Sequence, residues 1–153
     1  MNKTQNIITI FFFILITNCG YTPMLATNEE NFYIKDLVLE GDRNINISIS
    51  NKLKKFRIPK NNTTEYNLNI NSFYNKEIGN KDDKGNPKNY NLKLKTEILV
   101  QTKDGKEFSK SFNKSISLSV EDSKNKEREN EKKLKKSLSN LIAKEILFYI
   151  SNI

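Results

Sequence analysis

The sequence predicts an α+β fold in which two helices pack on one face of a four-stranded, mostly antiparallel sheet. Three segments in the middle of the chain alternate between apolar and polar residues, as half-buried strands do. A segment near the end of the chain places apolar residues at helical spacing, and a shorter one follows the first apolar run. The order strand, helix, three strands, helix therefore predicts a sheet that is covered on one side.

The first strand and the first helix are predicted within residues 31–56. A strand over about 31–40 follows from its apolar residues, which are Phe32, Ile34 and Val38, with Leu37 and Leu39 between them. Gly41 ends this strand, and Asp42 is expected to cap a helix over about 43–56. The helical stripe consists of Ile45, Ile49, Leu53 and Phe56. An alternative stays open in which Ile45, Ile47 and Ile49 form one face of a strand, because Ile47 does not fit the helical stripe.

Three further strands are predicted to form an antiparallel meander over about 64–77, 89–102 and 107–118. Pro59 separates the meander from the first helix. The connection over 79–88 contains no apolar residue that could bury it, and Asp104-Gly105 marks a tight turn. The side of the sheet away from the helices is expected to be polar and to face water or a polar lumen. Its expected members are Asn67, Asn69, Asn71, Lys93, Lys95, Glu97, Gln101, Lys110 and Lys114.

A long last helix is predicted from about Asp122 to Ser151. Its apolar stripe is expected to cover the sheet and consists of Leu134, Leu138, Leu141, Ile142, Ile146 and Tyr149. The stretch 121–133 has no apolar residue, which indicates a solvated face or a surface for a polar partner. Glu129–Lys133 and Glu131–Lys135 are ordered for i, i+4 ion pairs, each contributing about 0.2–0.5 kcal/mol.

Cys19 is the only cysteine, and it directly follows the apolar run 7–17. This run is too short to span a hydrocarbon core, which needs about 20 helical residues. We therefore expect a lipoprotein signal peptide over 1–18, a lipidated Cys19 with a short tether over 19–30, and a single α+β domain over 31–153. Asn18 departs from the small residue usual before a lipidated cysteine, and the alternative is that Cys19 is a small buried apolar side chain.

The chain carries a formal charge of +8 and contains no histidine. The positive charge fits an anionic partner or, equally, an AT-rich coding sequence, which favours Lys, Asn and Ile without selection for a ligand. Arginine occurs only at positions 43, 57 and 128, which disfavours sequence-specific nucleic-acid binding. No phosphate-binding loop, nucleophile motif or metal-ligand spacing is present, so we expect no enzyme activity, no cofactor and no metal.

These features together resemble the LptE family of lipopolysaccharide-assembly lipoproteins. The resemblance rests on the opening Cys19-Gly20-Tyr21-Thr22-Pro23, on the order of elements, on Tyr90 at the start of the third strand, and on Leu141-Ile142-Ala143-Lys144 in the last helix. It implies an outer-membrane lipoprotein, anchored on the periplasmic face, that plugs the β-barrel of an LptD-type translocon and helps it to assemble. The alternative from another functional class is a lipoprotein adaptor or pilotin-like chaperone for a different envelope protein.

The same resemblance implies contacts with lipopolysaccharide in two regions, the loop before the third strand and the start of the last helix. The candidate residues there are Lys81, Lys84, Lys88, Lys124 and Lys126. Asp83 and Asp122 stand where basic residues of the family would align. Phosphates and acidic sugars of the glycolipid are the groups that such lysines would bind.

Overall fold

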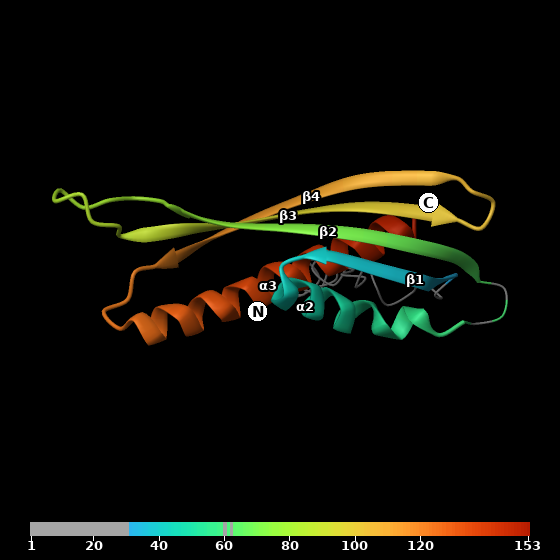
Figure 1. Cartoon of the computed structure of the whole chain (residues 1–153), viewed down its shortest axis with the longest axis horizontal. Helices are drawn as coiled ribbons and strands as arrows, with labels where there is room; N and C mark the ends of the chain where they lie inside the picture. Colours follow the sequence, from blue (N-terminus) through green and yellow to red (C-terminus); the bar gives the residue numbers. More distant parts are fainter. Residues whose placement is uncertain (1–30, 60, 62) are drawn as a thin grey trace, which may run out of the picture.

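The computed structural model describes residues 31–59, 61 and 63–153. Its elements follow the predicted order, and Figure 1 shows both main helices on the same side of the sheet. The α+β prediction is confirmed. The predicted signal peptide over 1–18 and the tether over 19–30, Cys19 included, lie outside the described residues. The elements are β1 (Phe32–Gly41), α2 (Arg43–Leu53), a 3-10 helix η1 (Lys54–Arg57), β2 (Thr64–Ile78), β3 (Asn89–Thr102), β4 (Glu107–Ser119) and α3 (Lys124–Ile150).

The four strands lie in the order β1-β2-β3-β4. The β1 and β2 strands are parallel, whereas β2, β3 and β4 form the predicted antiparallel meander. At the β3–β4 turn Gly105 has a φ of 83°, and its N–H donates to the carbonyl oxygen of Thr102 at 3.0 Å. A left-handed backbone of this kind favours glycine, which explains the Asp-Gly turn read from the sequence.

A register shift in β1 changes which side chains face the helices. Pairing with β2 is irregular between Ile34 and Asp36, so the alternation changes phase at this point. As a result Leu37 and Leu39 pack against the core, while Val38 is 50% exposed. Val38 therefore does not share the inner face with Phe32 and Ile34, because a period of two does not continue through a bulge.

The first helix is confirmed, and the strand alternative for Ile45, Ile47 and Ile49 is excluded. Asp42 is the N-cap, and its carboxylate accepts hydrogen bonds from the backbone N–H groups of Asn44 (2.9 Å) and Ile45 (3.2 Å). The buried face carries Ile45, Ile49 and Leu53, whereas Ile47 is 49% exposed. The last predicted turn is the 3-10 helix η1, in which Phe56 is buried.

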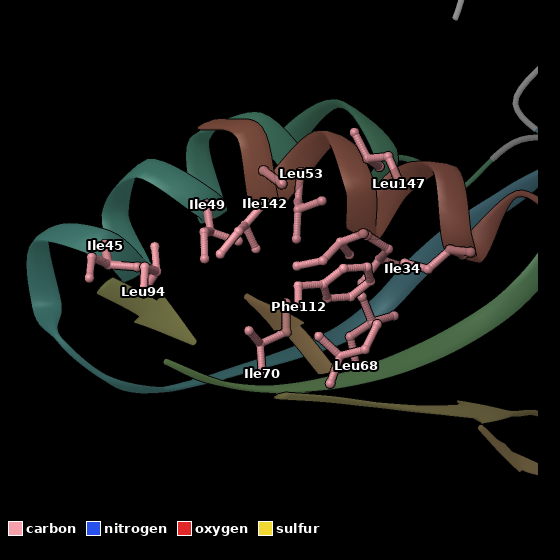
Figure 2. Close-up of a cluster of buried hydrophobic side chains, with 14 of the residues drawn as sticks. Ile34, Ile45, Ile49, Leu53, Leu68, Ile70, Leu94, Phe112, Ile142 and Leu147 are labelled. Carbon is pink, nitrogen blue, oxygen red and sulfur yellow. The ribbon is translucent and has the colours of Figure 1, made fainter. Parts of the chain in front are cut away.

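The hydrophobic core lies between the sheet and the two helices. Figure 2 shows side chains from β1, β2, α2 and α3 pointing into one cluster, among them Ile34, Ile49, Leu68 and Ile142. Aromatic rings close one end, where Phe32 and Phe56 stack with their ring centroids 5.3 Å apart. Burial of a large aliphatic side chain contributes roughly 1.5–3 kcal/mol, so this cluster fixes the helices to one face.

The buried stripe of α3 differs from the prediction in its second half. Leu138, Ile142 and Ile146 are buried as expected, but Leu141 is 45% exposed. Ala143, Leu147 and Ile150, which the prediction omitted, are buried instead. The reason is that α3 packs against α2 as well as against β4, so its buried face is wider than the sheet-facing stripe.

Candidate functional site

The loop between β2 and β3 holds three of the predicted lysines. Its chain reversal is organised by Asp82, whose carboxylate accepts hydrogen bonds from the backbone N–H groups of Lys84 (2.9 Å) and Asn86 (2.7 Å). These bonds, together with that from the Asn86 side chain, hold the pKa of Asp82 below its ordinary value. An isolated antiparallel β-bridge joins the backbone at Lys81 to that at Pro87 across the base of the loop. Lys81, Lys84 and Lys88 are exposed, and within the described residues they form no ion pair.

The start of α3 lies at the same end of the molecule as this loop, as Figure 1 shows. The two regions are connected directly, because the N–H of Val120 donates to the carbonyl oxygen of Lys88 at 3.1 Å. Lys124 and Lys126 already have acidic partners, since their Nζ atoms lie 3.5 Å from Glu127 Oε2 and 2.8 Å from Glu121 Oε2. The hydrogen bond to Glu121 raises the pKa of Lys126. The structure thus brings both predicted regions together, and of the five predicted lysines, all within its described part, only those of the loop form no ion pair.

The second surface of interest is the side of the sheet opposite the helices, which we call the open face. In the part of the chain that the structure describes, both helices lie on the other side. Asn67, Asn69 and Asn71 of β2 lie on the open face, paired with Gln101, Leu99 and Glu97 of β3. Lys93 and Lys95 also lie there, and ion pairs with Glu77 (2.5 Å) and Glu97 (2.6 Å) neutralise them.

The prediction for two lysines of β4 is wrong. Lys110 pairs with Ile98 and Lys114 with Leu94, and residues opposite each other in an antiparallel pair share a face. Ile98 and Leu94 are buried under the helices, so both lysines lie on the helix side. There Lys114 forms an ion pair with Glu145 of α3, and the Nζ of Lys110 lies 5.9 Å from the ring centroid of Tyr149.

Serine and asparagine occupy the open face of β4 in place of the lysines. The register assigns these positions to Ser109, Ser111, Asn113, Ser115, Ser117 and Ser119. Hydroxyl and carboxamide groups both donate and accept hydrogen bonds. Apart from the apolar residues Val38, Phe73 and Leu99, the open face is therefore a hydrogen-bonding surface. It carries little uncompensated charge along β3 and β4 and is more neutral than the sequence predicts.

A polar cluster between β2 and α3 was missed by the sequence analysis. Lys76 Nζ donates to Glu131 Oε2 (2.9 Å) and Glu127 Oε1 (3.2 Å), and the hydroxyl of Tyr74 donates to Glu131 Oε1 (2.8 Å). Lys135 reaches Asp42 Oδ2 at 3.0 Å, so the expected Glu131–Lys135 pair is replaced, whereas Glu129–Lys133 forms at 2.7 Å. The stretch 121–133 is therefore not wholly solvated, because Glu127 is 5% exposed.

The charges in this polar cluster stabilise one another. Burial alone would raise the pKa of Glu131, but the hydrogen bonds from Lys76 and Tyr74 outweigh it and leave that pKa below its ordinary value. Burial raises the pKa of Tyr74, and its bond to Glu131 raises it further. One pattern in the sequence could have indicated the cluster. Tyr74 and Lys76 continue the inner face of β2, and Glu127 and Glu131 are spaced i, i+4 on α3.

The fold is similar to that of several bacterial lipoproteins of known structure. Lipoprotein B from Nitrosomonas europaea matches with a TM-score of 0.57 and 14% identity, covering 80% of this chain and 86% of that one. Rare lipoprotein B from Shewanella oneidensis matches with a TM-score of 0.54 and 15% identity, covering 76% of this chain and 94% of that one. A minor lipoprotein from Acinetobacter baumannii matches with a TM-score of 0.57 and 17% identity, covering 79% of this chain and 93% of that one.

At these identities the similarity establishes a shared fold. No protein-family model and no curated protein sequence matches the chain. Among the described residues, no helix is both long enough and apolar enough to cross a membrane.

Proposed function

We propose that this chain is an envelope lipoprotein, anchored through Cys19 to the periplasmic face of the outer membrane, that acts as an LptE-like plug of an LptD-type β-barrel. The open face carries this proposal. A barrel lumen is lined by polar side chains, and a neutral surface rich in hydroxyl and carboxamide groups matches such a wall without burying unpaired charge. The fold shared with bacterial lipoproteins and the leader-like sequence before Cys19 support an anchored protein. The role is non-catalytic, since filling and ordering a barrel needs no reactive group.

Co-purification tests the proposal most directly. A tagged chain recovered from detergent-solubilised envelopes is expected to bring down one large outer-membrane β-barrel in near-equal amount, identified by mass spectrometry. Depletion of the chain is expected to lower the amount of that barrel. Recovery of an oligomeric secretion component instead would favour the adaptor function, for which the unpaired outer edges of β1 and β4 within the described sheet offer sites of strand addition.

Substitutions on the open face separate a plug from a protein that binds through its helices. Asn69→Trp with Ser111→Trp adds bulk to two exposed open-face positions and is expected to abolish recovery of the barrel while leaving the circular dichroism spectrum unchanged. The matched control is Ser137→Trp with Lys144→Trp, at exposed positions of α3. Loss of the barrel in the control alone would place the contact on the helices and contradict the proposal.

Lipid attachment at Cys19 is tested by Cys19→Ser. This variant is expected to keep the fold but to accumulate as the unprocessed precursor, because the thiol is the acylation site. Metabolic labelling with palmitate, followed by gel electrophoresis, measures both acylation and processing. Normal processing of the variant would show that Cys19 is not the anchor.

The loop lysines are proposed to contact phosphate groups of lipopolysaccharide. Lys84→Glu with Lys88→Glu is expected to weaken binding to purified lipopolysaccharide roughly tenfold at low salt, since two attractive contacts become repulsive. Lys103→Glu with Lys106→Glu makes the same change in net charge and serves as the control. Both lysines lie in the β3–β4 turn, which Figure 1 shows at the opposite end of the sheet. Equal weakening of binding in both variants would mean that overall charge, not the loop, sets the affinity.

A further inference from the structure

A pocket of about 430 Å³ lies between α2 and α3, and no part of the proposed plug function uses it. Its α2 wall includes Asn44, Ile47 and Asn51, and its α3 wall includes Arg128, Lys132 and Lys136. The two helices pack against each other along this line, so the walls are held by the core beneath them. Its lining residues belong to α2 and α3, which Figure 1 shows on one side of the sheet, so the pocket lies away from the open face.

The three cations of the α3 wall have no acidic partner. In the described part of the chain Arg128, Lys132 and Lys136 form no ion pair. The nearby acids are already engaged, which distinguishes these three cations from their neighbours on α3. Glu129 is bound by Lys133, Glu131 by Lys76 and Tyr74, and Asp42 by Lys135. The pocket therefore carries uncompensated positive charge that only an added anion can neutralise.

The spacing of the cations fits a chain with regularly placed charges. Arg128, Lys132 and Lys136 follow one another at four-residue steps, which on a helix is a rise of about 6 Å per step. Side chains on one face of an extended peptide repeat at about 6.6–6.8 Å. Carboxylates at alternate positions of an extended segment therefore match all three cations. A single phosphate group would meet only part of this row.

The α2 wall suits a peptide as well. The side-chain carboxamides of Asn44 and Asn51 make no hydrogen bond within the described residues, and each can bind both the N–H and the C=O groups of a peptide backbone. Ile47, which is 49% exposed, offers an apolar contact for a side chain between two carboxylates. Hydrogen-bonding groups and charges thus lie on opposite walls.

We propose that the α2–α3 pocket binds an extended acidic segment of a partner protein that carries carboxylates at alternate positions. The argument uses neither the lipid anchor nor the barrel, so the pocket can be tested separately from the plug function. Because the contacts are charge pairs at the surface, binding weakens as salt is added.

The test measures binding of two fluorescein-labelled peptides to the purified full-length protein by fluorescence anisotropy. The probe is acetyl-Glu-Ser-Glu-Ser-Glu-amide, and acetyl-Ser-Glu-Glu-Glu-Ser-amide has the same composition and charge in another spacing. Arg128→Gln, Lys132→Gln and Lys136→Gln are combined in one variant. The control variant combines Lys54→Gln, Lys103→Gln and Lys106→Gln, which removes the same charge from exposed positions elsewhere.

The expected result is saturable binding of the alternating peptide, several-fold weaker binding of the clustered peptide, and at least about tenfold loss of affinity in the pocket variant. The control variant is expected to bind within about twofold of the native protein. No saturable binding, or equal losses in both variants, would overturn the proposal. Displacement of the peptide by equal concentrations of inorganic phosphate or glycerol 3-phosphate would also overturn it, because the pocket would then be a phosphate site.

Discussion

Leu138→Asp is expected to unfold the protein. Leu138 lies on the inner face of α3, is 1% exposed, and belongs to the core between helices and sheet. The substitution removes a large apolar side chain and buries a carboxylate without a partner, at a cost of several kcal/mol. Domains of this size have a free energy of unfolding of only about 5–15 kcal/mol. Thermal unfolding followed by circular dichroism is expected to show loss of the cooperative transition or a melting temperature lowered by tens of degrees.

Leu141→Asp is the matched control for this prediction. It makes the same chemical change three residues further along the same helix, at a side chain that is 45% exposed. The free energy of unfolding is expected to change by less than about 1 kcal/mol, because an exposed charge remains hydrated. A large loss at Leu141 would mean that the exposed side of α3 is covered in the native protein. An unchanged melting curve for Leu138→Asp would show that α3 does not pack as described.

The strands could be predicted closely because their signal is local. In β2 and β3 apolar residues occupy most alternate positions, with Ser72, Lys76 and Thr96 as polar exceptions, and the predicted bounds lie within a residue of those observed. The alternating pattern could not predict which residues lie opposite each other on neighbouring strands. The bulge at the start of β1 exposes Val38, and the β3–β4 register moves Lys110 and Lys114 to the helix side. Both depend on which residues lie opposite each other on neighbouring strands, which no single segment specifies.

The last helix illustrates a second limit. A stripe at i, i+3, i+4 predicts one buried face, and for Leu138, Ile142 and Ile146 this is confirmed. A helix that contacts both a sheet and a second helix buries a wider surface, so Leu147 and Ile150 are covered as well. The packing of α2 beside α3 belongs to the tertiary structure, so it cannot be predicted from the sequence of α3 alone.

The candidate site was predictable only in part. The loop lysines follow from the polar connection 79–88 and lie at one end of the molecule together with the start of α3. The ion pairs at the start of α3 were not predictable. Lys124 pairs with Glu127 and Lys126 with Glu121, and both pairs depend on how the start of the helix folds. The polar cluster was not predictable from β2 alone, because its strand pattern does not show which acidic side chains lie beside Lys76. The partners of Lys76 are two acidic residues of α3, Glu127 and Glu131, which lie more than fifty residues further along the sequence.

Lys76→Met is expected to be the most destabilising single change in the polar cluster. Lys76 is the cation shared by Glu127 and Glu131, whose side chains are 7% and 21% exposed. Lys124 compensates Glu127 only in part, because it is 73% exposed and 3.5 Å away. Removing one partner of a buried pair leaves an uncompensated charge and costs about 3 kcal/mol. Urea denaturation at neutral pH measures this loss.

Lys93→Met provides the control on the opposite face of the sheet. Its ion pair with Glu77 joins side chains that are 52% and 44% exposed, so its removal is expected to cost less than about 1 kcal/mol. Equal losses for the two lysines would mean that solvent screens the polar cluster as fully as the open face. The triple variant with Lys76→Met, Glu127→Gln and Glu131→Gln is expected to recover most of the stability, because it leaves no unpaired carboxylate in the cluster.

The pH dependence distinguishes a charge effect from lost packing. The pKa values of Glu127 and Glu131 lie below their ordinary value of 4.5, since the hydrogen bonds from Lys76 outweigh the effect of burial. A carboxyl group with a lowered pKa stabilises the fold above its unfolded pKa, and this contribution is lost as the pH falls through the folded pKa. The native protein is therefore expected to lose stability as the pH falls below about 4.5.

The Lys76→Met variant has already lost this contribution, and in it protonation removes the unpaired negative charge of Glu127 and Glu131. The difference in unfolding free energy between the two proteins should narrow over the same range, whereas a difference that stays constant with pH would assign the effect to the packing of the lysine stem.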